Sequence, residues 1–179
     1  FSSDEWGGGD VFTTNIVESM TVVKTTAGGF TNGAIYFAGY LPGQIGWIAP
    51  DGSVNSNVWV TLPGESDAVS GLYVDETGTF GHNLIAVTGD GGVWEITASG
   101  TPTLLADITN APLQGVITLT NDSSQWGPWA GKIVIGSGDT NNPVVYSVSS
   151  SGMVTSNSDL GIVAGDFNLI PTNESLFFS

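Results

Sequence analysis

The chain has 179 residues, of which 26 are glycine, and hydrophobic residues make up 40% of it against 11% for charged residues. Intrinsically disordered polymers are excluded, because they lack the apolar surface needed to offset chain entropy. Helical bundles and coiled coils are disfavoured as well, since they need many more charged residues on their surfaces. The length suits one domain, and the class that remains is an all-β fold.

The balance of acidic and basic residues limits the classes of partner that the chain can bind. Seventeen acidic residues stand against two basic ones, Lys24 and Lys132, and the formal net charge is −15. Proteins that bind nucleic acids neutralise phosphates with Lys and Arg, so DNA and RNA are excluded as partners. An anionic membrane surface would repel the chain for the same reason. Phosphorylated substrates are disfavoured because there is no arginine to hold them.

Cysteine is absent, which excludes thiol catalysis, disulfides and cysteine-based zinc or iron–sulfur sites. A chain rich in Ser, Thr, Asn and Gly with almost no lysine favours a secreted or cell-surface protein. We expect no membrane insertion, because no apolar run of 18 residues is present. No signal peptide is seen either, which is typical of a mature or excised segment.

Short apolar runs separated by Gly, Asn and Asp turns predict strands throughout, and no stretch shows a convincing helical period. Residues 1–19 are interpreted as a lead-in, with a candidate outer strand at 11–16. Three groups of four strands follow: 20–23, 34–38, 46–49 and 57–62; then 71–75, 83–88, 92–98 and 103–108; then 115–120, 132–136, 144–149 and 153–160. Residues 164–179 look like the start of a fourth group.

The three groups are repeats of about 50 residues, a period within the range of propeller blades. Each repeat has an apolar run, a Gly-rich turn, a second run around an aromatic residue, and a turn that ends in glycine. The turn glycines are Gly52, Gly100 and Gly152, and the aromatic residues are Trp47, Trp94 and Tyr146. The aromatic residues are expected to pack between repeats. Ile35, Ile85 and Ile133 are expected at equivalent places on successive second strands.

This organisation resembles β-propellers of the NHL and gluconolactonase-like kind, which have four-stranded blades around a central channel. The predicted blades are 20–64, 65–112 and 113–163, with the start of a further blade at 164–179. A stacked β-solenoid is the alternative, although its coils would be shorter. In gluconolactonase-like enzymes a metal ion lies on a Glu, an Asn and an Asp of the inner strands. Glu18, Asn110 and Asp166 lie near blade starts here, but their surroundings match no family motif.

Three complete blades and part of a fourth predict a portion of a larger propeller, since propellers have four to eight blades. The segment Leu176-Phe177-Phe178 would end on an apolar strand edge, which invites pairing. We therefore expect either another part of the same polypeptide or a second chain to complete the ring. On this view residues 1–179 alone do not form an isolated soluble monomer.

In a propeller, the loops between second and third strands share one face with the linkers between blades. Four carboxylates are predicted on this face, and oxygen ligands of this kind suit calcium. They are Asp67, Asp90, Asp139 and Asp166. The alternative is that Asp and Asn occupy these turns for their turn geometry. The same carboxylates include candidates for an acid/base pair, whose separation the sequence does not give.

Aromatic and amide side chains are the candidates for ligand binding. Tyr40 and Gln44 are predicted beside the carboxylates, while Trp126 and Trp129 lie in an enlarged loop between a first and a second strand. Exposed indoles suit sugar and protein sites, and the alternative is that they cap the end of the blade core. His82, the one histidine, falls on the face opposite the carboxylates and is interpreted as an ordinary hairpin residue.

These observations favour an extracellular β-propeller that acts as a non-catalytic binding or assembly module for a protein or a glycan. The alternative is a metal-dependent propeller hydrolase, lactonase or lyase that uses carboxylates on the channel face. Binding is favoured because arginine and cysteine are absent, the histidine lies on the wrong face, and no catalytic spacing is recognisable.

Overall fold

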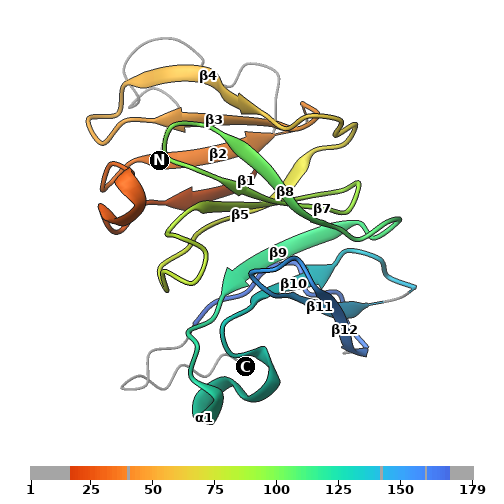
Figure 1. Cartoon of the computed structure of the whole chain (residues 1–179). Helices are drawn as coiled ribbons and strands as arrows, with labels where there is room; N and C mark the ends of the chain where they lie inside the picture. Colours follow the sequence, from red (N-terminus) through yellow and green to blue (C-terminus); the bar gives the residue numbers. More distant parts are fainter. Residues whose placement is uncertain (1–16, 40, 142, 160, 170–179) are drawn as a thin grey trace, which may run out of the picture.

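The computed structural model describes residues 17–39, 41–141, 143–159 and 161–169. Within them, three four-stranded antiparallel sheets follow one another along the chain, each with its strands in simple meander order (Figure 1). Blade 1 comprises β1 (Val17–Val22), β2 (Ile35–Gly39), β3 (Gln44–Ile48) and β4 (Val54–Thr61). Blade 2 comprises β5 (Val69–Val74), β6 (Leu84–Thr88), β7 (Gly92–Ile96) and β8 (Pro102–Asp107). Blade 3 comprises β9 (Leu113–Thr118), β10 (Ile133–Ser137), β11 (Val144–Val148) and β12 (Val154–Asp159).

All twelve predicted strands overlap observed ones, so the all-β prediction with three complete four-stranded blades is confirmed. The first strand of each blade lies beside that of the next, β1 beside β5 and β5 beside β9. This arrangement, with sheets radiating from their first strands, is that of a β-propeller. The predicted lead-in strand at 11–16 and most of the fourth blade lie outside the described residues. Residues 161–169 follow blade 3 without forming a strand.

In the part of the chain that the structure describes, helices are confined to loops between first and second strands. One 3-10 turn, η2 (Ala27–Gly29), lies in blade 1, and the pair α1 (Ser123–Trp126) and η3 (Gly127–Trp129) lies in blade 3. Asp122 caps α1, because its carboxylate accepts a hydrogen bond from the Ser124 amide at 2.9 Å. No described helix is long and apolar enough to span a membrane.

The turn between the third and fourth strands repeats in all three blades. The amides of Gly52, Gly100 and Gly152 each donate to the carbonyl three residues earlier at 2.9 Å. Their φ angles are 82°, 80° and 80°, in the left-handed region that glycine adopts without strain. The predicted repeat is therefore confirmed at its turns.

The predicted equivalence of the three isoleucines is wrong for one of them. Ile35 and Ile133 both pair with the residue four positions before the turn glycine. In blade 2 that place belongs to Leu84, and Ile85 lies one position further along β6. Since side chains alternate between faces, Leu84 enters the core shared with blade 1 while Ile85 enters the core shared with blade 3.

The repeated aromatic residues show the same one-residue difference. Trp94 and Tyr146 lie six positions before their turn glycines, whereas Trp47 lies five before Gly52. Trp47 therefore faces the following blade, and Trp94 faces the preceding one. Trp47 and Trp94 both pack into the core between blades 1 and 2, from opposite sides. Tyr146 packs into the core between blades 2 and 3. The expected packing between blades is confirmed.

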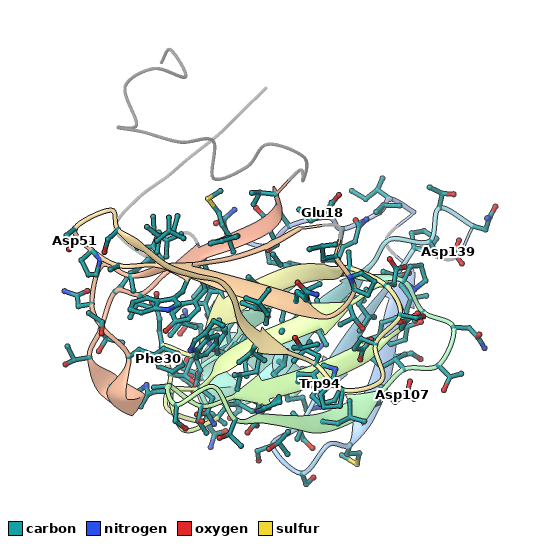
Figure 2. All side chains as sticks on the ribbon, turned by 90° about the horizontal axis from the view of Figure 1, so that it is seen from above. Glu18, Phe30, Asp51, Trp94, Asp107 and Asp139 are labelled. Carbon is teal, nitrogen blue, oxygen red and sulfur yellow. The ribbon has the colours of Figure 1, made fainter. Side chains whose placement is uncertain are left out.

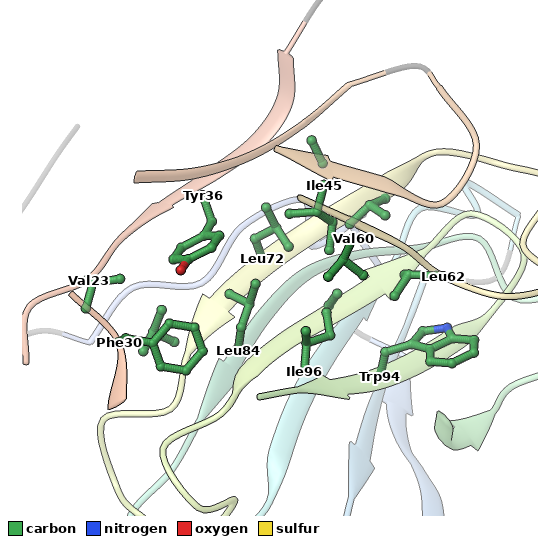
Figure 3. Packing of buried hydrophobic residues seen from close by; sticks show 14 of the residues in the cluster. Val23, Phe30, Tyr36, Ile45, Val60, Leu62, Leu72, Leu84, Trp94 and Ile96 are labelled. Atoms are coloured by element: carbon green, nitrogen blue, oxygen red, sulfur yellow. The ribbon is translucent and has the colours of Figure 1, made fainter. Parts of the chain in front are cut away.

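The core consists of three apolar clusters, one between blades 1 and 2, one between blades 2 and 3, and one on the far face of blade 3. In the first, Tyr36, Leu72 and Leu84 meet between the sheets (Figure 3). The ring of Tyr36 stacks against Trp47 with the centroids 6.3 Å apart. Most of the apolar burial therefore lies between the sheets.

A buried carboxylate fastens blade 2 to blade 3 at the end where first and second strands connect. Asp75 is fully buried and accepts hydrogen bonds from Thr118 of β9 at 2.9 Å and from the Phe80 amide at 2.9 Å. It also accepts both the amide and the hydroxyl of Thr77. Burial alone would raise the pKa of Asp75, but these hydrogen bonds outweigh it and the pKa is lowered.

We expect Asp75→Asn to lower the free energy of unfolding at pH 7 by about 1–3 kcal/mol, because buried donors lose a charged acceptor. A lowered pKa means that the carboxylate stabilises the fold above its unfolded-state pKa and that this contribution disappears as pH falls through the folded pKa. The difference between the variant and the parent should therefore shrink towards pH 3. Urea unfolding across this range measures it, with the exposed Asp51→Asn as control. Equal effects of both substitutions would contradict the role given to Asp75.

Candidate functional site

The loops between second and third strands meet the linkers between blades at one end of the sheets, as predicted. We call this end the loop face; it comprises residues 41–43, 62–68, 89–91, 108–112, 138–141 and 161–166. Figure 2 labels Asp107 and Asp139 at this end, and Phe30 and Asp51 at the opposite end. Backbone hydrogen bonds connect the segments: the Gly43 amide donates to the carbonyl of Asp67, and the Gly138 amide donates to that of Pro112.

Asp90 joins two of these segments. Its carboxylate accepts the amides of Ser66 and Asp67 at 2.5 and 2.8 Å, and the Ser66 hydroxyl as well. The backbone hydrogen bond from Ser66 is the main reason why the pKa of Asp90 is lowered. The linker between blades 1 and 2 is thereby held against the β6–β7 turn.

Glu65 anchors the same linker to the core of blade 2. Its half-buried carboxylate accepts the indole N–H of Trp94 at 2.6 Å and the hydroxyl of Thr88 at 2.7 Å. The Thr88 hydroxyl in turn accepts the amide of Gly92 at 2.9 Å. The sequence placed Glu65 on the loop face but gave no sign of these partners, which become neighbours only when the linker folds across β6 and β7.

The four predicted metal ligands are only partly brought together. Asp67 and Asp90 meet through the hydrogen bond from the Asp67 amide. Asp139 and Asp166 belong to other segments, where each accepts a nearby amide, from Asn141 at 2.8 Å and from Phe167 at 2.8 Å. In the described part of the chain, no three His, Asp or Glu side chains are grouped as a metal site. Calcium binding stays a prediction.

A cavity of about 280 Å³ opens beside the first strands of the blades. It is lined by residues of β1, β5 and β9 and by the segment after β12: Glu18, Ser19, Met20, Ser70, Gly71, Leu72, Gly115, Val116, Gly165 and Asp166. Each of these strands carries a β-bulge here, which shifts its pairing with the second strand by one residue. Glu18 of β1 and Asp166 of the segment after β12 are thus both among the residues of one lining.

Backbone segments approach one another closely around this cavity. A Cβ on Gly71 would lie 2.5 Å from the carbonyl oxygen of Gln114, and one on Gly115 would lie 2.6 Å from the Cα of Asp166. Only glycine fits between backbones at such distances. Asp166 therefore lies against Gly115 as Gln114 lies against Gly71.

Those of the predicted ligand-binding residues that the structure describes lie at opposite ends of the sheets. Trp126 and Trp129 are half-buried and pack against the third cluster, and the Trp126 indole donates to Thr120 Oγ1 at 2.8 Å. Their role in covering the blade core is confirmed, and a ligand-binding role stays a prediction. Gln44 begins β3 at the loop face, half-buried, and Tyr40 lies outside the described residues.

His82 lies at the end opposite the loop face, as expected. Its amide donates to the Asp75 carboxylate at 3.2 Å, and its ring Nδ1 lies 3.1 Å from the Asp75 carbonyl oxygen. These contacts place it in the hairpin that Asp75 organises.

Comparison with protein-family models gives no match, and no curated protein matches either. Among solved structures, the computationally designed Ika8 protein aligns with a TM-score of 0.54 at 11% identity, over 87% of this chain and 40% of that chain. A catalytically inactive virginiamycin B lyase from Staphylococcus aureus, crystallised with quinupristin, aligns with a TM-score of 0.48 at 11% identity, over 86% and 59%. Such likenesses concern the fold alone, and this chain spans less than two thirds of either structure. The finer resemblance to NHL and gluconolactonase-like propellers stays a prediction.

We expect Glu65→Ala to lower the free energy of unfolding by about 1–3 kcal/mol, because Trp94 and Thr88 lose their acceptor. Amide hydrogen exchange in residues 64–68 should accelerate as the linker detaches. The matched control is Asp67→Ala, whose exposed carboxylate accepts the amide of the next residue at 2.7 Å. Urea unfolding and exchange mass spectrometry measure both variants. The anchoring role is wrong if Glu65→Ala perturbs the linker no more than Asp67→Ala does.

Proposed function

We propose that the chain is part of an extracellular propeller that binds a protein or a glycan through its loop face, without catalysis. The observation that carries this proposal is the set of hydrogen bonds that fixes the loops in place. Glu65 and Asp90 fasten the first linker, and backbone bonds tie the other segments to it. A surface fixed before binding loses little conformational entropy when a ligand arrives.

The surface chemistry of the loop face supports the same proposal. The carboxylates of Asp90 and Glu65 accept hydrogen bonds from the Asp67 amide and the Thr88 hydroxyl, so they hold loops in place, which favours a binding role over catalysis. Leu41 and Ile162 are exposed on it, and such apolar groups contribute binding energy when a partner covers them. With a net charge of −15, ligands with neutral or positive surfaces are favoured over acidic ones. The extracellular location is supported by composition, since the chain is rich in Ser, Thr, Asn and Gly and has only two basic residues, both lysines.

Binding is tested by screening residues 1–179 on a glycan array and against purified extracellular matrix and cell-surface ectodomains. We expect at least one ligand, and Leu41→Asp with Ile162→Asp should weaken its affinity at least tenfold, because charge replaces apolar contact area. Met153→Asp is the control, since the exposure of Met153, 62%, lies between those of Leu41 and Ile162, 45% and 70%, but Met153 lies at the end opposite the loop face. The absence of any ligand, or affinity that is insensitive to the loop-face variant, would contradict the proposal.

A second candidate is a metal-dependent propeller hydrolase, lactonase or lyase. One observation favours it: Glu18 and Asp166 line the same cavity beside the first strands. Carboxylate oxygens are ligands that calcium accepts, and a bound cation would relieve their mutual repulsion. Residues of the chain would then hold the metal at the centre of the propeller, and the loop face would surround the substrate.

If calcium binds there, a chelator should lower the melting temperature and added calcium should restore it, because ligands of the folded state stabilise it by mass action. Asp166→Asn should abolish this response, and Asp139→Asn, in a separate loop, is the control. Calcium-dependent turnover of a lactone or ester that is lost in Asp166→Asn would favour the enzyme over the binding module. A melting temperature unchanged from micromolar to millimolar calcium would count against the metal.

A further inference from the structure

One face of blade 1 is apolar and uncovered in the described structure. Met20 and Val22 alternate along β1 and point away from blade 2, with 61% and 46% of their surfaces exposed. Val22 pairs with Ile35 of β2, so Ile35 lies on the same face. Adjacent exposed apolar groups of this kind mark a contact surface rather than an ordinary exterior.

The equivalent positions are covered in the other two blades. Pairing with the second strand aligns Met20 with Leu72 and Val116, which are 6% and 4% exposed. In the same way Val22 aligns with Val74, which is 3% exposed. In each case the cover is the preceding blade. The face of blade 1 thus has the residues of an interface that the molecule forms twice elsewhere.

The covering surface has a defined chemistry. Blade 1 covers blade 2 with Tyr36, Ala38 and Ile45. Blade 2 covers blade 3 with Ile85, Val87 and Val93. Both are strand faces made mainly of apolar side chains; the face of blade 2 also carries the half-buried Glu95, which pairs with Ile85. We propose that the face formed by Met20, Val22 and Ile35 takes one further four-stranded blade of the same propeller, with an apolar face of this kind.

A second copy of the chain fits this face less well. In a head-to-tail contact, blade 3 of the second copy would have to offer its far face. That face is already packed by Trp126, Trp129 and Phe167 of its own chain. Asp166 occupies the place against Gly115 that the next first strand would take.

The net charge of the chain and the length of a solved chain with this fold also favour a further blade over a second copy. A net charge of −15 on each copy opposes their association. A solved chain with this fold is much longer, since the match uses 40% of it.

The two methionines of the chain provide a direct readout. Met20 and Met153 are 61% and 62% exposed, so limited oxidation should convert them at similar rates in dilute residues 1–179. Hydrogen peroxide transfers one oxygen atom to the thioether sulfur and leaves water, and the rate follows exposure. A blade on β1 would shield Met20 and leave Met153, beyond β11 in blade 3, unchanged.

The experiment extends the full chain at its N-terminus with a copy of residues 65–112, which carries the face that covers blade 3. We expect the oxidation rate of Met20 relative to Met153 to fall about tenfold, as the exposed fractions of 61% at Met20 and 6% at Leu72 indicate. The matched control carries Ile85→Asp and Val87→Asp in the added copy only, and should lose the protection. A second extended chain carries residues 17–64 instead, whose face covers blade 2. If one added blade fails to fold, the other still tests whether Met20 becomes protected.

Three results would overturn the proposal. Met20 could stay as reactive as Met153 with both extensions. Protection could persist in the Ile85→Asp and Val87→Asp control, so that it does not depend on the apolar face. Finally, the unextended chain could protect Met20 increasingly with concentration, in step with its mass by light scattering, which would identify a second copy as the occupant.

Discussion

The structure depends on one constraint: the middle blade is apolar on both faces and is stable only between two others. Every residue of β6 is buried, and its side chains alternate between the core shared with blade 1 and the core shared with blade 3. Burial of apolar surface is the main favourable term in folding, so neither core forms without this blade. Most of what distinguishes the three blades follows from which of their faces have a neighbour.

The same packing brings the polar anchors together at the two ends of the sheets. Where first and second strands connect, Asp75 reaches Thr118 of the next blade, and Lys24 of blade 1 forms an ion pair with Glu76 of blade 2 at 3.0 Å. At the loop face, Glu65 reaches Trp94 across a linker. The buried Asp75 and the half-buried Glu65 stabilise the fold because packing brings them donors, Thr118 of blade 3 for Asp75 and Trp94 of blade 2 for Glu65. An unpaired carboxylate at either site would be costly. The rigidity of the proposed binding surface is thus a result of blade packing.

The pattern of strands and turns was predictable from local chemistry. Apolar runs and the glycines at 52, 100 and 152 mark strands and turns because backbone conformation at those points depends on few neighbours. The pairing register was less predictable, as Ile85 and Trp47 show. A shift of one residue sends a side chain to the other face, and spacings that vary by a residue between repeats do not reveal it.

By itself, the sequence determined the all-β class and the four-stranded repeat, because these follow from composition and periodicity. From the net charge of −15 it also predicts that nucleic acids are not partners, and that stays a prediction. It also located the acidic residues of the loop face. The tertiary structure alone decided that Glu65 and Asp90 hold the linker, that Glu18 and Asp166 share a cavity, and that Met20 is exposed where Leu72 is buried. Those facts depend on contacts between residues far apart in the chain, and such contacts exist only once the blades have packed against one another.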